Sequence, residues 1–328
     1  MLHESWRPNL FLSSAQKTAR VIGLWLLLCL SLSACQNMTK LLTSTASSAP
    51  VPAAGVAIIV SDSSPAFTGV QRELARKFSQ PVSVYVLSDE SANASVRKKI
   101  AASPKTTIVA IGLPAARLAR SLTNKKVIFC QVFNYEEAGL VTPWMKGVAA
   151  TVPMREQFRV WKTLYPNLSR VGAITGNNLQ GLMKEAQEAA DANQIQLVHV
   201  VVKSDKETLY AYKKLTPKVQ GMWLVPDNRV LSHGVIRDVM AHSVKQGMPV
   251  AVFGGELLGL GGLISLETSH ADIADQVMAR VRQAQDATGV PGSSVMPLTK
   301  ATIRINTVMA QRLNLKIPES LLGMAYAP

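Results

Sequence analysis

The chain has 328 residues, and its 35 Lys and Arg against 21 Asp and Glu give a formal net charge of +14. This length is enough for one large α/β domain or two smaller lobes, and a hydrophobic content of 48% allows a sizeable core. The basic residues are scattered through helical segments and form no stripe with interleaved aromatic residues. This pattern excludes nucleic acid from the expected partners.

The first 34 residues are predicted to be an export signal that is not part of the fold. Basic residues precede an apolar run over residues 21–32, which is shorter than the roughly 20 residues of a membrane span. The run ends in Leu-Ser-Ala-Cys, with the cysteine at position 35, and this ending resembles the lipobox of bacterial lipoproteins. The resemblance implies that Cys35 is the first mature residue and carries the lipids. Gln36, the residue after this cysteine, then resembles the sorting signal that directs lipoproteins to the outer membrane of a Gram-negative cell. The alternative is an ordinary signal peptide with an incidental cysteine.

The remaining cysteine and the segment after the lipobox fit an exported protein. Residues 35–54 are predicted to comprise the lipidated cysteine and a Ser-, Thr-, Ala- and Pro-rich flexible tether. Once Cys29 leaves with the signal and Cys35 is acylated, only Cys130 remains, so no intrachain disulfide is expected. Cys130 lies in an apolar run and is predicted to be a small buried hydrophobe.

From Gly55 onward, apolar strands alternate with segments of helical spacing. The pattern predicts strands at 56–60, 82–87, 107–111, 127–132, 171–175, 197–202, 222–225, 250–253, 263–266 and 302–305. It predicts helices at 67–78, 89–102, 114–122, 155–164, 179–192, 206–215, 230–246, 271–285 and 308–313. The alternation pauses at 140–152. Two runs of βα units joined by a non-periodic crossing indicate two similar lobes with parallel sheets.

The stretch from Gly221 to Ser232 is the most informative. An apolar strand stops at Pro226, and Asp227 and Asn228 follow before the helical pattern resumes. A carboxylate and an amide therefore stand at the carboxyl end of a parallel strand, where open α/β sheets bind ligands. The alternative is that Asp227 only caps its helix.

Several segments, in this order and spacing, resemble one known family. They are IVAIGLPAARLARSLTNKKVIFCQVFNYEEAGLV (108–141), LYPNLSRVGAITG (164–176), WLVPDNRVLS (223–232), GMPVAVFGGE (247–256) and IRINTVMAQRLNLKIPESLL (303–322). Together they resemble the substrate-binding proteins of ABC transporters, specifically the lipoprotein family that includes tryptophan- and tyrosine-type binders. The resemblance covers nearly everything from Gly55.

The family implies a type I periplasmic-binding-protein fold, in which two doubly wound parallel-sheet lobes are joined by three crossings and hold the ligand between them. We expect the crossings near residues 141–151, 266–270 and 295–300. Lobe one is then residues 55–148 with 268–296, and lobe two is residues 149–267 with 297–328.

The sequence departs from the family where ligand contacts are usual. Gly112-Leu113 stands where a Gly-Thr pair is common, and Asn134-Tyr135 stands where Asp-Pro is common. These departures leave the identity of the ligand open, although Asp227 remains able to accept a hydrogen bond from an ammonium group. The predicted ligand-binding residues, all near strand carboxyl ends, are Ser63, Ser64, Gly112, Leu113, Asn134, Tyr135, Thr175, Asn177, Asp227, Asn228, Gly254 and Gly255.

The expected function is a lipid-anchored solute-binding protein of an ABC-type uptake system. It would bind an amino acid or similar small molecule between the lobes, face the periplasm, and deliver the ligand to an inner-membrane permease. The alternative is an outer-membrane lipoprotein that uses the fold as a protein-interaction or regulatory module with another envelope protein. No catalytic motif, metal-ligand spacing or cofactor fingerprint is found, so no enzyme, metal or cofactor is expected.

Overall fold

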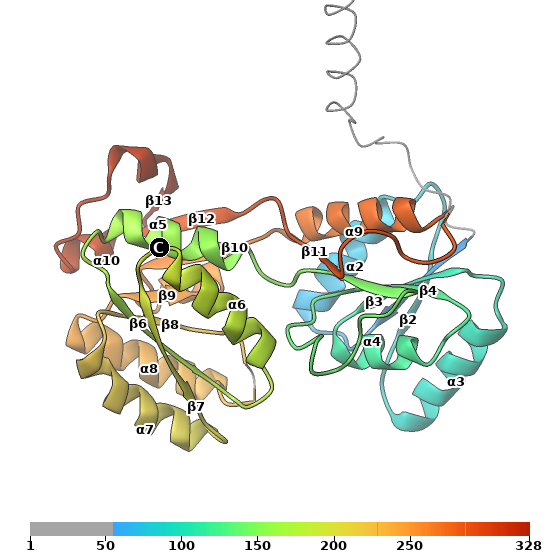
Figure 1. The fold of residues 1–328 in the computed structure, drawn as a ribbon, viewed down its shortest axis with the longest axis horizontal. Coiled ribbons are helices and arrows are strands. Elements are labelled where there is room, and N and C mark those ends of the chain that lie inside the picture. Colours follow the sequence, from blue (N-terminus) through green and yellow to red (C-terminus); the bar gives the residue numbers. More distant parts are fainter. Residues whose placement is uncertain (1–54, 228, 286) are drawn as a thin grey trace, which may run out of the picture. The chain divides into compact units, whose positions relative to one another are not determined.

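The computed structural model describes residues 55–227, 229–285 and 287–328, which form an α/β structure with two sheets (Figure 1). The predicted signal peptide, Cys35 and the tether lie outside the described residues, as does Asn228. The two-lobed α/β fold predicted from the alternation is confirmed.

The first lobe is built on a sheet whose described strands follow the order β11-β5-β4-β3-β1-β2. All its strand pairs are parallel. The strands are β1 (Val56–Val60), β2 (Ser83–Val86), β3 (Thr107–Ile111), β4 (Lys126–Cys130), β5 (Met145–Val148) and β11 (Val295–Met296). The helices are α2 (Pro65–Arg76), α3 (Glu90–Ala102), α4 (Leu113–Arg120) and α9 (His270–Gln285).

Both faces of this sheet are covered, because side chains along each strand alternate between two separate cores. Val56, Ile58 and Val60 pack with α2 and α9, whereas Ala57 and Ile59 pack with α3 and α4. Figure 1 shows the two helix pairs on opposite faces of the sheet. This two-sided burial explains why the strand reads as a continuous apolar run.

The second lobe repeats the plan, with described strands in the order β13-β12-β10-β9-β8-β6-β7. Its strands are β6 (Arg170–Thr175), β7 (Gln196–Val201), β8 (Gly221–Trp223), β9 (Val250–Val252), β10 (Ile264–Glu267), β12 (Thr302–Asn306) and β13 (Ala325–Tyr326). Its helices are α5 (Met154–Leu164), α6 (Gln180–Asp191), α7 (Asp205–Leu215), α8 (His233–Gln246) and α10 (Thr307–Arg312). One core lies against α5, α6 and α10, and the other against α7 and α8.

The chain passes between the two sheets three times. It leaves the first sheet after β5 and enters the second lobe at α5, returns between β10 and α9, and crosses again between β11 and β12. The last crossing delivers β12 antiparallel to β10. Alternating hydrophobicity gives no strand direction, so the sequence did not predict this antiparallel pair.

Candidate functional site

Each sheet has one topological switch point, where strand order reverses. In the first sheet it lies between β1 and β3, and in the second between β6 and β8. Helices that leave neighbouring strands in opposite directions open a crevice at the carboxyl ends of these strands, and open α/β sheets bind ligands there. The residues that follow β1, β3, β6 and β8 are therefore the first candidates for a site.

In the first lobe, Ser61 and Gly112 meet at the switch point. The Ser61 hydroxyl donates to the Ile111 carbonyl at 2.8 Å and accepts from the Ala115 amide at 3.0 Å. Ser61 therefore joins β1, β3 and the first turn of α4. Gly112 has a φ of 87°, and a Cβ atom there would lie 2.5 Å from the Ser61 Oγ and 2.8 Å from the Phe67 ring.

Gly112→Ala should lower the free energy of unfolding by about 2 kcal/mol, because alanine is strained at this φ and its methyl group overlaps Ser61. Urea unfolding followed by circular dichroism measures the change. Gly234→Ala is the matched control: it lies near the start of α8, its Cβ would meet only Ser232 Oγ at 3.9 Å, and we expect a small gain in stability. Equal effects of the two substitutions would contradict the close packing at Gly112.

The other predicted residues of the first lobe lie near the same edge but differ in exposure. Ser63 is exposed, and Ser64 precedes α2, with its amide donating to the Asp62 carboxylate at 2.7 Å. Leu113 begins α4 and is half-buried. These side chains stand at the edge of the sheet, and among the described residues no hydrogen bond fixes them to the core.

Asn134 and Tyr135 follow β4, one strand away from the switch point. Both are half-buried, and the Tyr135 ring lies 5.9 Å from the Phe129 ring, centroid to centroid. Burial and nearby Glu136 and Glu185 raise the pKa of the Tyr135 hydroxyl. Tyr135 therefore packs on the core of its lobe and keeps its proton at neutral pH.

In the second lobe, Thr175 ends β6 and is fully buried. Its hydroxyl lies 2.8 Å from the Gly176 carbonyl and 2.8 Å from the His199 Nε2 atom. Burial lowers the pKa of His199, so the imidazole is neutral at pH 7. Asn177 follows on the surface, and its carbonyl accepts from the Gln180 side chain.

Asp227 is the centre of the polar contacts at the second switch point. Its side chain is buried, with a relative exposure of 2%, and its Oδ2 atom accepts from the Gly176 amide at 2.9 Å. The Arg229 guanidinium binds both carboxylate oxygens, through Nε to Oδ1 at 2.7 Å and through Nη2 to Oδ2 at 2.8 Å. The pair thus joins the ends of β6 and β8.

The alternative that Asp227 caps the following helix is wrong. Helix α8 begins at His233, three residues later than its apolar pattern predicts, and Ser232 is the residue before it. The Ser232 hydroxyl accepts from the Val235 amide and supplies the cap. The side chain of Asp227 is directed to Gly176 and Arg229 instead.

Gly254 and Gly255 follow β9, next to the crossing back to the first lobe. Gly254 is buried, and the Gly255 amide donates to the Glu267 carboxylate at 3.1 Å. Glu267 also forms an ion pair with Arg304, so the two crossing strands β10 and β12 are bound together beside Gly255. Through its bond to Glu267, Gly255 therefore helps to hold the ends of β10 and β12, where the chain crosses between the lobes.

A hydrogen bond joins the loop after β4 in the first lobe to helix α6 in the second. The Glu137 carboxylate accepts from the Gly181 amide at 2.9 Å. Helix α6 has no capping side chain at its own start and no acidic residue in its first turn. Glu137 therefore supplies the negative charge that a helix N-terminus favours, and sequence reasoning missed it because the two residues are far apart in the chain.

Glu185 lies on the same helix, and burial together with Glu136 and Glu188 raises the pKa of its carboxyl. The stability that a raised carboxyl pKa contributes is present below the unfolded-state pKa and is lost as pH rises through the folded-state pKa. Glu185→Gln should therefore raise the free energy of unfolding at pH 7 by at most about 0.5 kcal/mol, because the side chain is partly exposed and screened, and the melting temperature should rise slightly with it. At pH 4 the two proteins should melt alike, and a difference that persists there would contradict the electrostatic cause.

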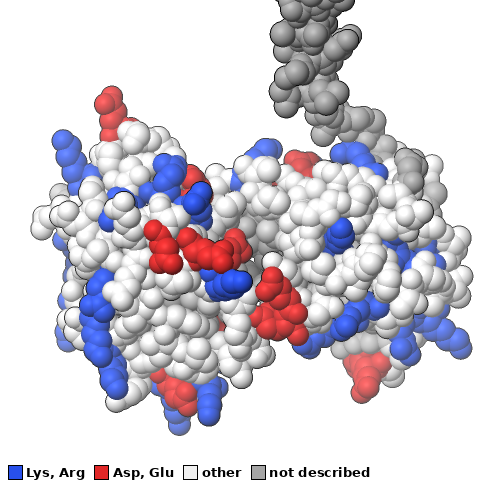
Figure 2. All heavy atoms as spheres, viewed as in Figure 1, with Lys and Arg blue, Asp and Glu red and all other residues white. Residues whose placement is uncertain are grey.

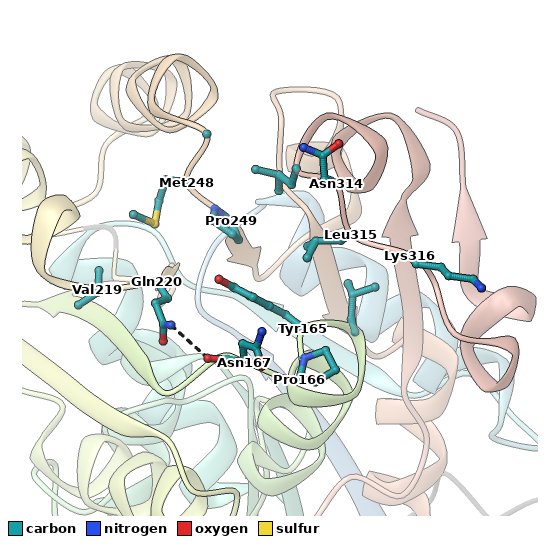
Figure 3. A pocket seen from close by; sticks show the side chains of 13 residues that line it. Tyr165, Pro166, Asn167, Val219, Gln220, Met248, Pro249, Asn314, Leu315 and Lys316 are labelled. Atoms are coloured by element: carbon teal, nitrogen blue, oxygen red, sulfur yellow. Dashed lines mark hydrogen bonds between the residues drawn. The ribbon is translucent and has the colours of Figure 1, made fainter.

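A pocket of about 620 Å³ lies at the edge of the second sheet where β6, β8 and β9 begin, opposite to the edge that carries Asp227. It is lined by the segments that lead into β6, β8 and β9 and by the segment after α10 (Figure 3). Figure 3 shows the Tyr165 ring across the pocket, near the bond from the Gln220 side chain to the Asn167 carbonyl at 3.1 Å. None of the predicted ligand-binding residues lines this pocket.

Four further features bear on function. Cys130 is buried and free, as predicted, and burial raises the pKa of its thiol to about 12. No group of His, Cys, Asp and Glu side chains suited to a metal ion occurs among the described residues. Within the same residues no helix has the length and apolar character that crossing a membrane requires. On the face shown in Figure 2, Lys and Arg side chains are dispersed with acidic side chains between them.

Comparison with protein families gives one match, which covers most of the fold. The profile of the family described as ABC transporter substrate binding protein matches residues 80–327. The chain belongs to this family. Its members are solute-binding proteins of ABC transporters and not enzymes, and those of importers act outside the cytoplasm. A search of curated protein sequences finds no match.

Solved structures share the fold. An ABC domain from Streptococcus pneumoniae in complex with L-Trp is 23% identical, with a TM-score of 0.63, over 83% of this chain and 98% of that one. A ligand-free, open substrate-binding protein with adhesive properties from Clostridium difficile is 16% identical, with a TM-score of 0.65, over the same shares of 83% and 98%. A conserved domain protein from Vibrio cholerae is 18% identical, with a TM-score of 0.62, over 83% and 98%. The family member described here therefore has the type I periplasmic-binding-protein fold.

Proposed function

We propose that this substrate-binding protein is a lipid-anchored receptor that binds an amino acid or a compound of similar size between its lobes and delivers it to an ABC permease. The observation that carries the proposal is the group of polar atoms at the second switch point, where the ends of β6 and β8 present Gly176, Asp227 and Arg229. Ligand-binding proteins of this architecture close two lobes about a hinge, without any chemical step. The L-Trp bound to the Streptococcus pneumoniae protein supports a ligand of amino-acid size.

The predicted binding residues support the proposal by their placement. Ser63, Ser64, Gly112 and Leu113 follow β1 and β3, and Thr175, Asn177 and Asp227 follow β6 and β8. Asn134, Tyr135, Gly254 and Gly255 follow the neighbouring strands β4 and β9. The predicted residues that the structure describes therefore lie at carboxyl ends of parallel strands, where open α/β sheets bind ligands.

A thermal-shift screen of the full-length protein in mild detergent tests binding. A cognate ligand at 100 times its dissociation constant should stabilise the protein by about 2.7 kcal/mol. The screen includes amino acids, organic acids, nucleosides and sugars. A melting temperature that no compound raises would count against the receptor function.

The lipid anchor is tested separately. We infer from Leu32-Ser33-Ala34-Cys35 that Cys35 is acylated, so mass spectrometry of the mature N-terminus should find a diacylglyceryl group on this residue. Cys35→Ser should release the protein from the membrane fraction. Retention of the serine variant in membranes would contradict the anchor.

A second candidate function is an interaction module at the outer membrane, favoured by Gln36 and by the short segment between Cys35 and the fold. Fractionation of inner and outer membranes distinguishes the candidates. A receptor for an inner-membrane permease should co-purify with that permease in the presence of ligand. Recovery from the outer membrane with another envelope protein, and with no ligand response, would favour the module.

A further inference from the structure

The position beside Asp227 that a ligand's ammonium group would take is already occupied by a cation of the chain itself. Arg229 binds the carboxylate through two side-chain nitrogens, at 2.7 and 2.8 Å, and its amide adds a third contact at 3.3 Å. The Gly176 amide donates the fourth, at 2.9 Å. An ionised carboxylate has about four acceptor sites, so these donors saturate it. A ligand ammonium group would have to displace Arg229 before it reached Asp227.

Asp227 uses only some of the hydrogen-bond donors of the Arg229 guanidinium. The Arg229 side chain is 38% exposed, and Nη2 lies over Gly176, because a Cβ atom on that glycine would be 3.4 Å from it. Among residues 55–227, 229–285 and 287–328, Nη1 of Arg229 donates no hydrogen bond. Within the described part of the chain, both N–H groups of Nη1 are therefore without an acceptor.

The pairing with Asp227 orients this cation. Two parallel bonds from one guanidinium to one carboxylate fix the plane of the group. A planar, pre-oriented guanidinium loses little freedom when it binds a second carboxylate, so its donors suit an anion of that shape. Asp227 thereby acts as a positioning residue, and Arg229 as the residue that contacts the ligand.

We propose that Arg229 binds a carboxylate of the ligand, and that the ligand's ammonium group, if it has one, is not recognised by Asp227. The inference rests on the proposed function and specifies its substrate class: small organic acids, including 2-hydroxy and 2-oxo acids, bind as well as the corresponding amino acids. The sequence offers a signal for it, since Arg229 stands two positions after Asp227 and shortly after an apolar strand.

Titration calorimetry on the full-length protein in mild detergent tests the proposal with matched ligands. One set is L-leucine, 4-methyl-2-oxopentanoate and 3-methylbutylamine; the other is L-phenylalanine, phenyllactate and phenethylamine. Within at least one set, the two acids should bind with similar affinity and the amine should not bind. An amine that binds as tightly as its amino acid would overturn the proposal.

Three variants make the test specific. Arg229→Met should weaken binding of both acids by about 10- to 100-fold, the range expected for hydrogen bonds to a charged group, and should allow the amine to bind the released Asp227. Arg229→Lys keeps a positive partner for the buried carboxylate, so it tests anion binding in a folded protein, and we expect a loss of about tenfold. Arg159→Met is the matched control, because Arg159 forms the same two-nitrogen pair with Glu156 on the exposed side of α5; its ligand affinities should equal those of the wild type.

The outcomes separate the inference from the function on which it rests. Unchanged acid binding in both Arg229 variants would refute the inference while the receptor function stands. Binding of a neutral nucleoside or sugar, with no response to any acid, would do the same. If no compound of any class binds the wild-type protein, the receptor function fails and the inference fails with it.

Discussion

Arg280→Met should lower the free energy of unfolding by about 3–5 kcal/mol. Arg280 lies on α9 with a relative exposure of 0%, and burial lowers the pKa of its guanidinium. It has no carboxylate partner within the part of the chain that the structure describes, and it donates instead to the carbonyls of Gly147, Pro291 and Ser293. Methionine fills part of the volume but leaves these carbonyls without their donor, and each unsatisfied buried group costs about 1–3 kcal/mol.

The effect matters for function because Arg280 holds the start of the last crossing. Gly147 belongs to β5, and Pro291 and Ser293 lead into β11, the strand from which the chain crosses to the second lobe. Urea unfolding of the whole protein measures the loss in the free energy of unfolding. Arg97→Met, at an exposed position of α3, should change stability by less than about 0.5 kcal/mol. A loss at Arg280 no greater than at Arg97 would contradict the structural role.

Asp227→Ala should lower stability by about 2–4 kcal/mol and weaken ligand binding by at least about tenfold. The substitution leaves the buried Gly176 amide without an acceptor and Arg229 without its counter-ion. The loss is below that of a fully buried pair because the Arg229 side chain is partly exposed. Without Asp227 the guanidinium is no longer fixed at the ends of β6 and β8, so binding falls even for ligands that never contact Asp227.

The matched control for this prediction is Glu156→Ala, which removes the carboxylate of the exposed Glu156–Arg159 pair on α5. Exposed ion pairs contribute less than about 1 kcal/mol, so this variant should unfold nearly as the wild type does. Chemical unfolding and calorimetry on both variants complete the comparison. An Asp227 variant with wild-type stability and affinity would show that the pair neither joins the strands nor orients a binding group.

Most of the fold was predictable because its strands are buried on both faces. The continuous apolar runs at Val56–Val60 and Thr107–Ile111 predict strands whose bounds match the structure. The sequence missed β5, β11 and β13, which have two to four residues each. Such strands form through pairing with neighbours, and β5 contains Lys146 and Gly147, which break any apolar pattern.

The position of Asp227 at the carboxyl end of a strand was predictable from the sequence, but its contacts were not. Asp227 follows an apolar run that stops at Pro226, and this local signal predicted a strand end, which the structure has at Trp223. Its bonds to Gly176 and Arg229 depend on how two strands and a turn meet, which periodicity does not encode. In the sequence Arg229 was one basic residue among 35, and only the geometry distinguishes it.

The most direct test of the account is a crystal structure of the protein purified without denaturation, with its co-purified or calorimetrically identified ligand bound. The account predicts electron density for the ligand between the carboxyl ends of β1 and β3 and those of β6 and β8. A ligand oxygen should lie about 3 Å from Nη1 of Arg229, with the Asp227–Arg229 pair intact. A ligand in the pocket around Tyr165, or one whose ammonium group replaces Arg229 on Asp227, would contradict it.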